Sequence, residues 1–470
     1  MEDTTSSETY AFFPLTVFDR MFERNAFVTG WLVKGTIDTA ALAAALDRVT
    51  EKWRMLAGRL QSVKEGEDTK WCLKIPLGPI PKDYPKYALT ISTSDVPLSA
   101  YVSIPIPRTS TSLPLDVFLH PSTPRQYATW ESTEHPLTCW HITHFPASQN
   151  DGAAYTCIGF ARGHGIFDGG GAALIVSALV AELRGETWTP PARPPHAGPN
   201  PNPVEEVLSR EPAGPYSRRD YVGYSPLGVG GYVKLIAWHS RERWWRGADR
   251  RVVIVPKAVL THLVERVRDA VRAEDKELYI STGDVLVAWV FKTIYSTTIN
   301  PSMLIHCTNL ANFRSLLKDK VDTAQLYPHN AFIPLPYPVL SIADVQSYSL
   351  PTLTKLFSAS RHSLSLNHVV EAYRQLQHPV FPSPPNADET LVVSNVSASR
   401  ILEADWTPLG VGRTLCGYRY QATPMGVVFT NAVYIAGRLD DGSVVLDVTL
   451  NQARFDLLVA DIERLEEEVS

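Results

Sequence analysis

Prolines crowd one short segment of the chain, and this segment limits the folds that are possible. They stand at Pro190, Pro191, Pro194, Pro195, Pro199, Pro201 and Pro203. Proline fixes φ and has no backbone N–H, so such a segment forms neither a helix interior nor a central strand. We therefore predict an extended, proline-rich linker over residues 189–228, between an N-terminal half, residues 1–188, and a C-terminal half, residues 229–470. A chain of 470 residues suits two domains, at roughly 100–200 residues each.

Helix and strand patterns follow one another in the N-terminal half. Asp38 can cap a helix, because apolar residues recur after it at helical spacing. The run AYTCIGFA, residues 154–161, is typical of a buried strand. The run GAALIVSALVAEL, from Gly171, is typical of a helix that stops at Gly185.

The C-terminal half repeats this alternation. A strand is expected at Arg251–Val255, Pro256 opens a helix, and a second helix begins near Thr282. Asp440, Asp441 and Gly442 join two apolar runs in the pattern of a hairpin, and an amphipathic helix closes the chain. We predict a mixed α/β (α+β) fold with two mixed-sheet domains, and a site between them.

Composition excludes several classes of partner. Lys and Arg number 44 and Asp and Glu 49, a net charge of −5, so no overall basic field exists to hold nucleic acid. No run approaches the roughly 18–20 apolar residues of a membrane span, and the polar opening Met1–Thr9 lacks the layout of a signal peptide. We expect a cytoplasmic protein without a membrane partner. The scattered cysteines should be reduced and buried; they are Cys72, Cys139, Cys157, Cys307 and Cys416.

The run ARGHGIFDGGG, residues 161–171, is the stretch most informative about chemistry. It places His164 and Asp168 in a glycine-rich turn between a strand and a helix, and such turns often hold functional side chains. A neutral imidazole can accept a proton near neutral pH, a contribution of about 10²- to 10⁴-fold to catalysis. His164 is therefore a candidate general base, although an isolated His-x-x-x-Asp is more often a structural turn.

Two other kinds of site are weaker hypotheses. A metal site could combine His164 and Asp168 with Cys139, His141 or His144, but His141 and His144 would point to opposite faces of a strand. A hydrolase would need a nucleophile, and the sequence has neither a G-x-S-x-G elbow nor a cysteine in a recognisable nucleophile context. We predict no metal site.

The His-x-x-x-Asp-Gly motif after a buried strand resembles the BAHD acyltransferase superfamily and is similar to chloramphenicol acetyltransferase and peptide-synthetase condensation domains. PLTVFDRMF, STGDVLVAWVF and NLANFR, which ends at Arg314, resemble further segments of that family in the same order. The family's DFGWG signature is degraded here to residues 404–410, ADWTPLG, downstream of Ser394 and Asn395. The resemblance covers nearly the whole chain and points to a divergent, fungal-type branch.

The resemblance implies acyl transfer from acyl-CoA, a co-substrate rather than a bound cofactor, to a hydroxyl group of a specialised metabolite, or to an amine. His164 would be the base and Asp168 would orient or brace the turn. Asn395 is a candidate oxyanion donor. The remaining motif residues are expected to brace the structure; they are Gly169, Arg314, Asp405 and Trp406. Arg314 is a possible ion-pair partner of Asp168 or of Asp405. The resemblance also implies a monomer.

Three alternatives remain open. A condensation reaction with a carrier-bound donor would usually show two adjacent histidines, whereas residue 163 is glycine. The base could instead trigger a cyclisation or another rearrangement. Finally, the chain could be a binding protein on an inactivated acyltransferase fold.

Overall fold

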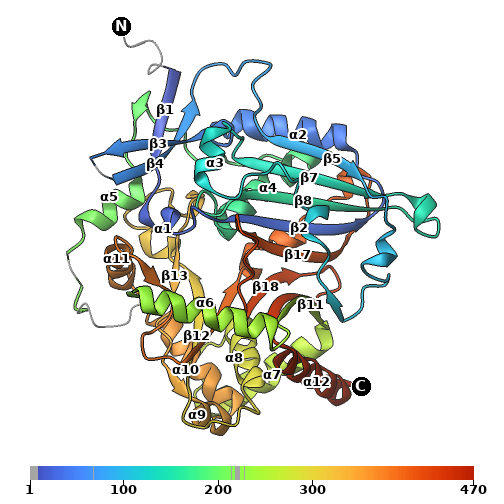
Figure 1. Ribbon diagram of the computed structural model, residues 1–470, viewed down its shortest axis with the longest axis vertical. Coiled ribbons are helices and arrows are strands. Elements are labelled where there is room, and N and C mark those ends of the chain that lie inside the picture. The colour runs from blue at the N-terminus through green and yellow to red at the C-terminus, as the bar shows by residue number, and fades with distance from the viewer. Residues whose placement is uncertain (1–8, 67, 213, 217–222, 227) are drawn as a thin grey trace.

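The computed structural model describes residues 9–66, 68–212, 214–216, 223–226 and 228–470. All of the opening Met1–Thr9 except Thr9, and part of the predicted linker, lie outside these ranges. Two large sheets organise the molecule, one above the other in Figure 1, and each has helices packed against it.

The upper sheet has five strands in the order β17-β2-β8-β7-β5. β8 lies at its centre and pairs antiparallel with both neighbours. All nine residues of β8 are buried, as expected for a strand covered on both faces. The strands of this sheet are β2 (Ala26–Lys34), β5 (Ala88–Thr93), β7 (Thr138–Phe145), β8 (Tyr155–Gly163) and β17 (Thr414–Ala422).

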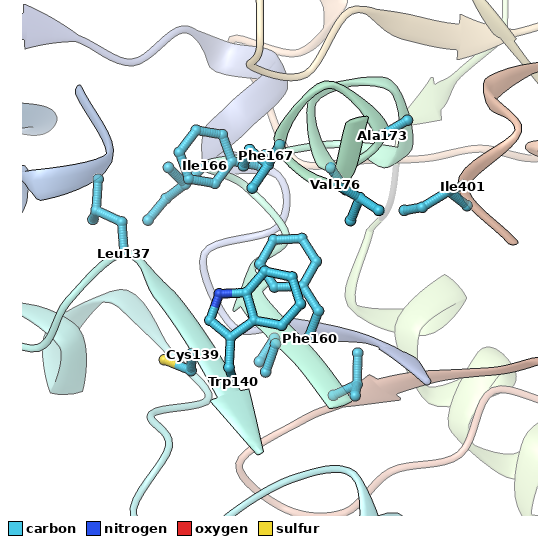
Figure 2. Close-up of a cluster of buried hydrophobic side chains, with 14 of the residues drawn as sticks. Leu137, Cys139, Trp140, Phe160, Ile166, Phe167, Ala173, Val176 and Ile401 are labelled. Atoms are coloured by element: carbon cyan, nitrogen blue, oxygen red, sulfur yellow. The ribbon is translucent and has the colours of Figure 1, made fainter. Parts of the chain in front are cut away.

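Helices α2 (Thr39–Lys52) and α4 (Gly169–Arg184) belong to this sheet's layer. Beneath α4, Trp140 of β7 stacks on Phe160 of β8 with ring centroids 4.4 Å apart. Figure 2 shows Val176 of α4 beside Ile401, in the same cluster of buried side chains as this aromatic pair. The predicted strand at residues 154–161 and the helix that stops at Gly185 are thus confirmed, with α4 beginning two residues before Gly171.

The lower sheet follows the order β13-β12-β16-β18-β19-β11-β6, and β14 also pairs with β12. Its core is formed by valine-rich strands and four helices, α7 (Lys257–Glu274), α8 (Thr282–Ile294), α10 (Leu350–His362) and α12 (Gln452–Val469). The strands are β6 (Thr109–Thr111), β11 (Asp249–Val255), β12 (Leu304–Asn312), β13 (Phe332–Pro334), β14 (Leu340–Ser341), β16 (Glu389–Asn395), β18 (Ala432–Arg438) and β19 (Val444–Leu450).

Each sheet receives one strand from the other half of the sequence. β17, from the C-terminal half, forms an edge of the upper sheet against β2. β6, from the N-terminal half, forms an edge of the lower sheet against β11. The proposed division at residues 188 and 229 therefore describes segments of sequence, whereas the two sheets interlock. This exchange brings the end of β8 close to residues of the C-terminal half.

The predicted linker contains regular structure as well as extended chain. Residues 190–197 are extended or turn, as the prolines predict, and β9 (Gly198–Pro199) pairs with β1 (Tyr10–Pro14). α5 (Pro203–Arg210) was not predicted: Asn202 caps it and Pro203 occupies the first turn, where a missing N–H costs nothing. α6 (Val229–Trp244) follows the linker and crosses the front of the molecule in Figure 1.

Two small sheets and four further short α-helices complete the α-helices and strands of the described ranges. One sheet has the order β3-β4-β1-β9, and the other pairs β10 with β15. The remaining elements are β3 (Arg59–Glu65), β4 (Asp68–Pro76), β10 (Ser225–Pro226), β15 (Val380–Phe381), α1 (Val17–Arg20), α3 (Tyr127–Ser132), α9 (Ile342–Ser347) and α11 (Leu366–Gln375).

Several local predictions hold in detail. The Asp38 carboxylate accepts from the N–H groups of Ala40 and Ala41 at 3.0 and 2.9 Å, so it caps α2 as expected. Pro256 precedes α7, and β18 and β19 pair antiparallel across the Asp440–Gly442 turn. The five cysteines are buried and unpaired. Among the described residues, no helix has both the length and the apolar character to cross a bilayer.

Candidate active site

His164 lies directly after β8, in the turn that leads to α4. Its backbone N–H donates to the carbonyl of Asn25 at 2.9 Å. Its own carbonyl accepts from the Asn330 side chain at 3.1 Å. The backbone is therefore held from both sides, while the residue as a whole is only half-buried. The structure thus fixes the position of His164 and leaves part of it accessible.

Aromatic rings surround the imidazole of His164. Phe22 stacks on it with centroids 4.2 Å apart and an interplanar angle of 11°. Phe27 meets it at 4.9 Å and 78°, and Phe332 lies 6.1 Å away. Neither ring nitrogen makes a hydrogen bond to another residue in the described ranges. The ring orientation is thus set by packing, and its nitrogens are not occupied by a protein partner.

This environment keeps His164 unprotonated at neutral pH. Burial among apolar rings lowers its pKa from 6.5 to about 4. A hydrogen bond with its own backbone raises the pKa, while the nearby positive charges of Arg162 and Arg419 lower it further. The neutral imidazole required of a general base is therefore the form present at pH 7.

Close packing explains why residues 165 and 171 of the motif are glycines. A Cβ added at Gly165 would lie 2.0 Å from the hydroxyl of Tyr127 and 2.2 Å from the carbonyl of Asp19. A Cβ at Gly171 would lie 1.8 Å from the carbonyl of Pro328. Real Cβ atoms do not approach backbone so closely, so only glycine allows this turn to pack against segments from elsewhere in the chain.

Asp168 makes no hydrogen bond to the His164 ring in the described ranges, and its carboxylate accepts from several other donors. Its Oδ1 accepts from the N–H of Gly171 at 2.8 Å, which caps α4. Two Arg314 nitrogens donate to its two oxygens at 2.9 and 3.0 Å, and the N–H of Ala331 donates at 3.2 Å. Both residues are buried. Arg314 is thus the partner of Asp168, and this pair braces the turn against the segment that follows β12.

Asp405 has a different arginine and a more open position. It pairs with Arg184 at 2.5 Å, with 30% and 40% of the two side chains exposed, and also accepts from the N–H of Thr407. The suggestion that Arg314 might serve Asp405 is therefore wrong. The next residue, Trp406, is buried and meets Trp31 edge-on at 5.1 Å. The degraded signature thus holds the segment before β17 against β2 and α4.

Asn395 ends β16 and is half-buried. Its side-chain oxygen accepts from the N–H and hydroxyl of Ser397 at 3.1 and 2.7 Å. Its amide nitrogen faces the start of α8, 2.8 Å from where a Cβ of Gly283 would stand. No hydrogen bond or ring contact among the described residues joins Asn395 to His164. Its role as an oxyanion donor stays a prediction.

Sequence reasoning did not single out three buried residues around the turn. Asp19 accepts from the N–H and hydroxyl of Thr16 at 2.7 and 2.9 Å and from the N–H of Asn330 at 2.9 Å. Its signal was the Thr-x-x-Asp capping pattern within PLTVFDRMF. Arg162 and Arg419 lie beside Phe27. Arg162 stands at the end of the uniformly buried, largely apolar strand β8, which gave no signal for it. Only the tertiary structure brings Arg419 beside it.

No group of three or more His, Cys, Asp or Glu side chains in the described ranges could hold a metal ion. A cavity of about 400 Å³ between α8 and α12 and another of about 160 Å³ beside α7 contain none of the predicted site residues. The candidate site is the environment of His164, on the strength of its sequence motif and geometry, and it lies outside both of these cavities.

Comparison with known proteins finds two fungal relatives. The chain is 27% identical over 221 residues to the O-acyltransferase pboC of Aspergillus ustus, covering 46% of this chain and 42% of the relative. It is 26% identical over 300 residues to the acetyltransferase adrJ of Penicillium roqueforti, covering 60% and 57%. The chain thus spans about half the length of the curated relatives it matches. No family model matches it.

Solved structures share the fold over almost the whole chain. Fusarium sporotrichioides TRI101, complexed with coenzyme A and T-2, gives a TM-score of 0.65 at 13% identity over 96% of this chain and 97% of that protein. Vinorine synthase gives 0.54 at 13% over 96% and 93%, and a condensation domain of the calcium-dependent antibiotic synthetase gives 0.53 at 14% over 96% and 93%. The predicted two-domain, chloramphenicol acetyltransferase-like fold is confirmed.

Proposed function

We propose that this protein transfers an acyl group from an acyl-CoA thioester to a hydroxyl group of a small specialised metabolite. One observation carries the proposal: His164 is neutral and half-buried, and its ring nitrogens make no hydrogen bond to any other residue that the structure describes. The relatives named as O-acyltransferase and acetyltransferase support this choice, as does the fold shared with TRI101 in complex with coenzyme A.

In this mechanism His164 accepts the proton of the acceptor hydroxyl as its oxygen attacks the thioester carbonyl. The resulting tetrahedral intermediate collapses, the C–S bond breaks, and the proton held by His164 goes to the departing thiolate. The products are the ester and free coenzyme A, and the imidazole is neutral again. The low pKa of His164 favours return of the proton, since the imidazolium is destabilised among aromatic rings.

Negative charge develops on the carbonyl oxygen in the intermediate, and a positioned donor stabilises it by a few kcal/mol, about 10²- to 10³-fold in rate. We assign this role to Asn395, whose oxygen is held by Ser397 so that its amide nitrogen is left to donate. Asp168 takes no part in proton transfer, because Arg314, Gly171 and Ala331 occupy its oxygens. Its effect on His164 is to hold the turn.

The test uses purified protein with a panel of acyl-CoA thioesters, with and without a pooled metabolite extract. Free thiol and new acylated masses are followed for the wild type, for His164→Gln and for His196→Ala. His196 is exposed and lies outside the site, so this variant controls for handling. We expect thiol release and an acylated product with the wild type and with His196→Ala, and at least about 10²-fold less with His164→Gln.

The same experiment separates the alternatives. Acylated amines in place of esters would change the acceptor class and leave the mechanism intact. Extract components that change in a His164-dependent way without thioester consumption would indicate another proton-transfer reaction. Activity only with carrier-bound thioesters would indicate a condensation reaction. No change with any protein would favour a binding role on this fold. The cytoplasmic, monomeric state remains a prediction that size-exclusion and localisation experiments address.

A further inference from the structure

Two buried arginines beside the candidate base have no acidic partner. Arg162 on β8 is 1% exposed and Arg419 on β17 is 3% exposed. Within the described ranges, no carboxylate comes within ion-pair distance of either guanidinium. Arginine stays charged in proteins, so both groups carry a positive charge into the interior. Buried charges are normally paired, because desolvation is otherwise costly.

Two other buried arginines of this protein follow that rule. Arg314 forms its two-pronged pair with Asp168. Arg454 pairs with Glu389 at 2.5 Å and donates to Asn431 at 2.8 Å.

Arg59 also lacks an acidic partner in the described ranges, but its guanidinium donates to the carbonyls of Ala57, Gly58 and Pro85. The pair beside His164 differs in that one of its members, Arg419, has neither a counter-ion nor partners for its Nε and Nη1 in the described part of the chain.

The guanidinium of Arg419 also keeps hydrogen-bond donors unused. Its Nε and Nη1 are buried and have no partner in the described part of the chain. Arg162 is better satisfied, since its Nε donates to the carbonyl of Phe167 at 3.2 Å and its Nη1 to the hydroxyl of Thr29 at 3.3 Å. Arg419 is thus the residue with unused N–H donors, and Arg162 adds a second positive charge near it.

Neither of two nearby carboxyl groups fills this need. Asp168, whose charge acts on Arg162, is already paired with Arg314. Asp447 on β19 accepts from the backbone N–H of Arg419 at 3.3 Å, and its other oxygen lies 3.6 Å from Nε of Arg250. Burial raises the pKa of Asp447 to about 6. The Asp447 carboxyl therefore interacts with the Arg419 backbone and with Arg250, not with the Arg419 guanidinium. That guanidinium lies over the ring of Phe27, 4.8 Å from its centroid.

The unpaired guanidinium lies at the N-terminus of α4. Arg419 Nη2 is 3.8 Å from the position of a Cβ on Gly169, the first residue of this 16-residue helix. Asp168 caps only the N–H of Gly171 with its side chain, so the partial positive charge of the helix end adds to that of the arginines. Phe27, which touches Arg162 and Arg419, also contacts the His164 ring.

We propose that Arg419, with Arg162 behind it, binds a carboxylate of one of the two substrates at the N-terminus of α4, beside His164. The identity of the two substrates rests on the proposed function. Two sources offer this group: an acceptor that is a hydroxy acid, or a donor whose acyl chain ends in a second carboxylate, as in malonyl-CoA. Either would supply the counter-ion that Arg162 and Arg419 lack.

Binding is measured by calorimetry on the full chain, in a donor arm and an acceptor arm. The donor arm compares malonyl-CoA and succinyl-CoA with acetyl-CoA. The acceptor arm compares aliphatic, aromatic and polycyclic hydroxy acids with their methyl esters. The proteins are the wild type, Arg419→Met, Arg419→Lys and, as control, Arg413→Met, an arginine just before β17 whose side chain is 76% exposed.

In one arm we expect the carboxylate to bind the wild type about 10- to 100-fold more tightly than its neutral counterpart, the range for hydrogen bonds to a charged group. Arg419→Met should remove this preference, Arg419→Lys should restore part of it, and Arg413→Met should retain it. The melting temperature of Arg419→Met should be unchanged or raised, because an unpaired buried charge is replaced by an apolar side chain of similar length.

Two results would overturn the proposal. One is a wild-type protein that binds neutral and carboxylated members equally in both arms. The other is a folded Arg419→Met variant that keeps the preference for the carboxylate. If Arg419→Met does not fold, Arg419→Lys decides: the proposal is overturned if this variant binds the carboxylated ligand only as tightly as the wild type binds the neutral one. Failure of acyl transfer is a separate outcome: binding is read without turnover, so Arg419-dependent carboxylate binding would stand even if no thioester were consumed.

Discussion

Replacing Asp168 by alanine should destabilise the protein far more than replacing Asp405, although the sequence presents both as aspartates of a family motif. Removing Asp168 leaves the Arg314 guanidinium buried with only the carbonyls of Tyr327 and His329 as partners. Breaking such a buried pair costs about 3–5 kcal/mol. Loss of the α4 cap costs about 1 kcal/mol, and because the terms overlap we expect a total of about 4 kcal/mol.

Asp405 offers the matched comparison. Its pair with Arg184 is partly exposed, with 30% and 40% of the side chains accessible, and such pairs contribute about 0–1 kcal/mol. Urea unfolding followed by tryptophan fluorescence measures both variants under the same conditions. The Asp168→Ala/Arg314→Met double variant should recover at least about 1 kcal/mol relative to the sum of the single changes, because no charge is then left unpaired.

The reasoning is refuted if Asp168→Ala loses less than about 1 kcal/mol, or if Asp405→Ala loses as much as Asp168→Ala. Either result would mean that the buried pair is not a brace for the turn. A change in the acid limb of the pH–rate profile without loss of stability would instead place Asp168 in proton transfer.

Three further predictions concern the base, the turn and the oxyanion. On the proposal that neutral His164 is the base, its pKa of about 4 means that kcat/KM should stay level from about pH 8 down to about pH 5.5 and fall only below that; an acid limb centred near 6.5 would contradict this environment. Gly165→Ala should lower stability by several kcal/mol in thermal unfolding, or prevent folding, whereas Gly78→Ala, where an added Cβ meets nothing within 4 Å, should be within about 0.5 kcal/mol of the wild type. Asn395→Ala should lower kcat about 10²- to 10³-fold if its amide meets the oxyanion; Ser397→Ala, which removes only a hydroxyl that donates to Asn395, should be milder, and equal, small effects would remove Asn395 from the mechanism.

Local sequence determined the elements that depend on neighbouring residues. The Asp38 cap, the Pro256 helix start and the hairpin at Gly442 need partners only a few residues away, so their patterns were readable directly. The strand-turn-helix that carries His164 belongs to the same class, because glycine content and apolar runs fix it locally. α5 was missed since the density of prolines around it masked a good cap.

Only the tertiary structure decided which distant groups meet. Asp168 and Arg314 are separated by 146 residues and Arg184 and Asp405 by 221, so the choice of partner depends on how the two sheets interlock. The same is true of β17, which enters the upper sheet and brings Arg419 beside Arg162. Periodicity records which face of an element is apolar, but not what packs against it. The residues of the turn were therefore visible in sequence, whereas their charge environment was created by packing.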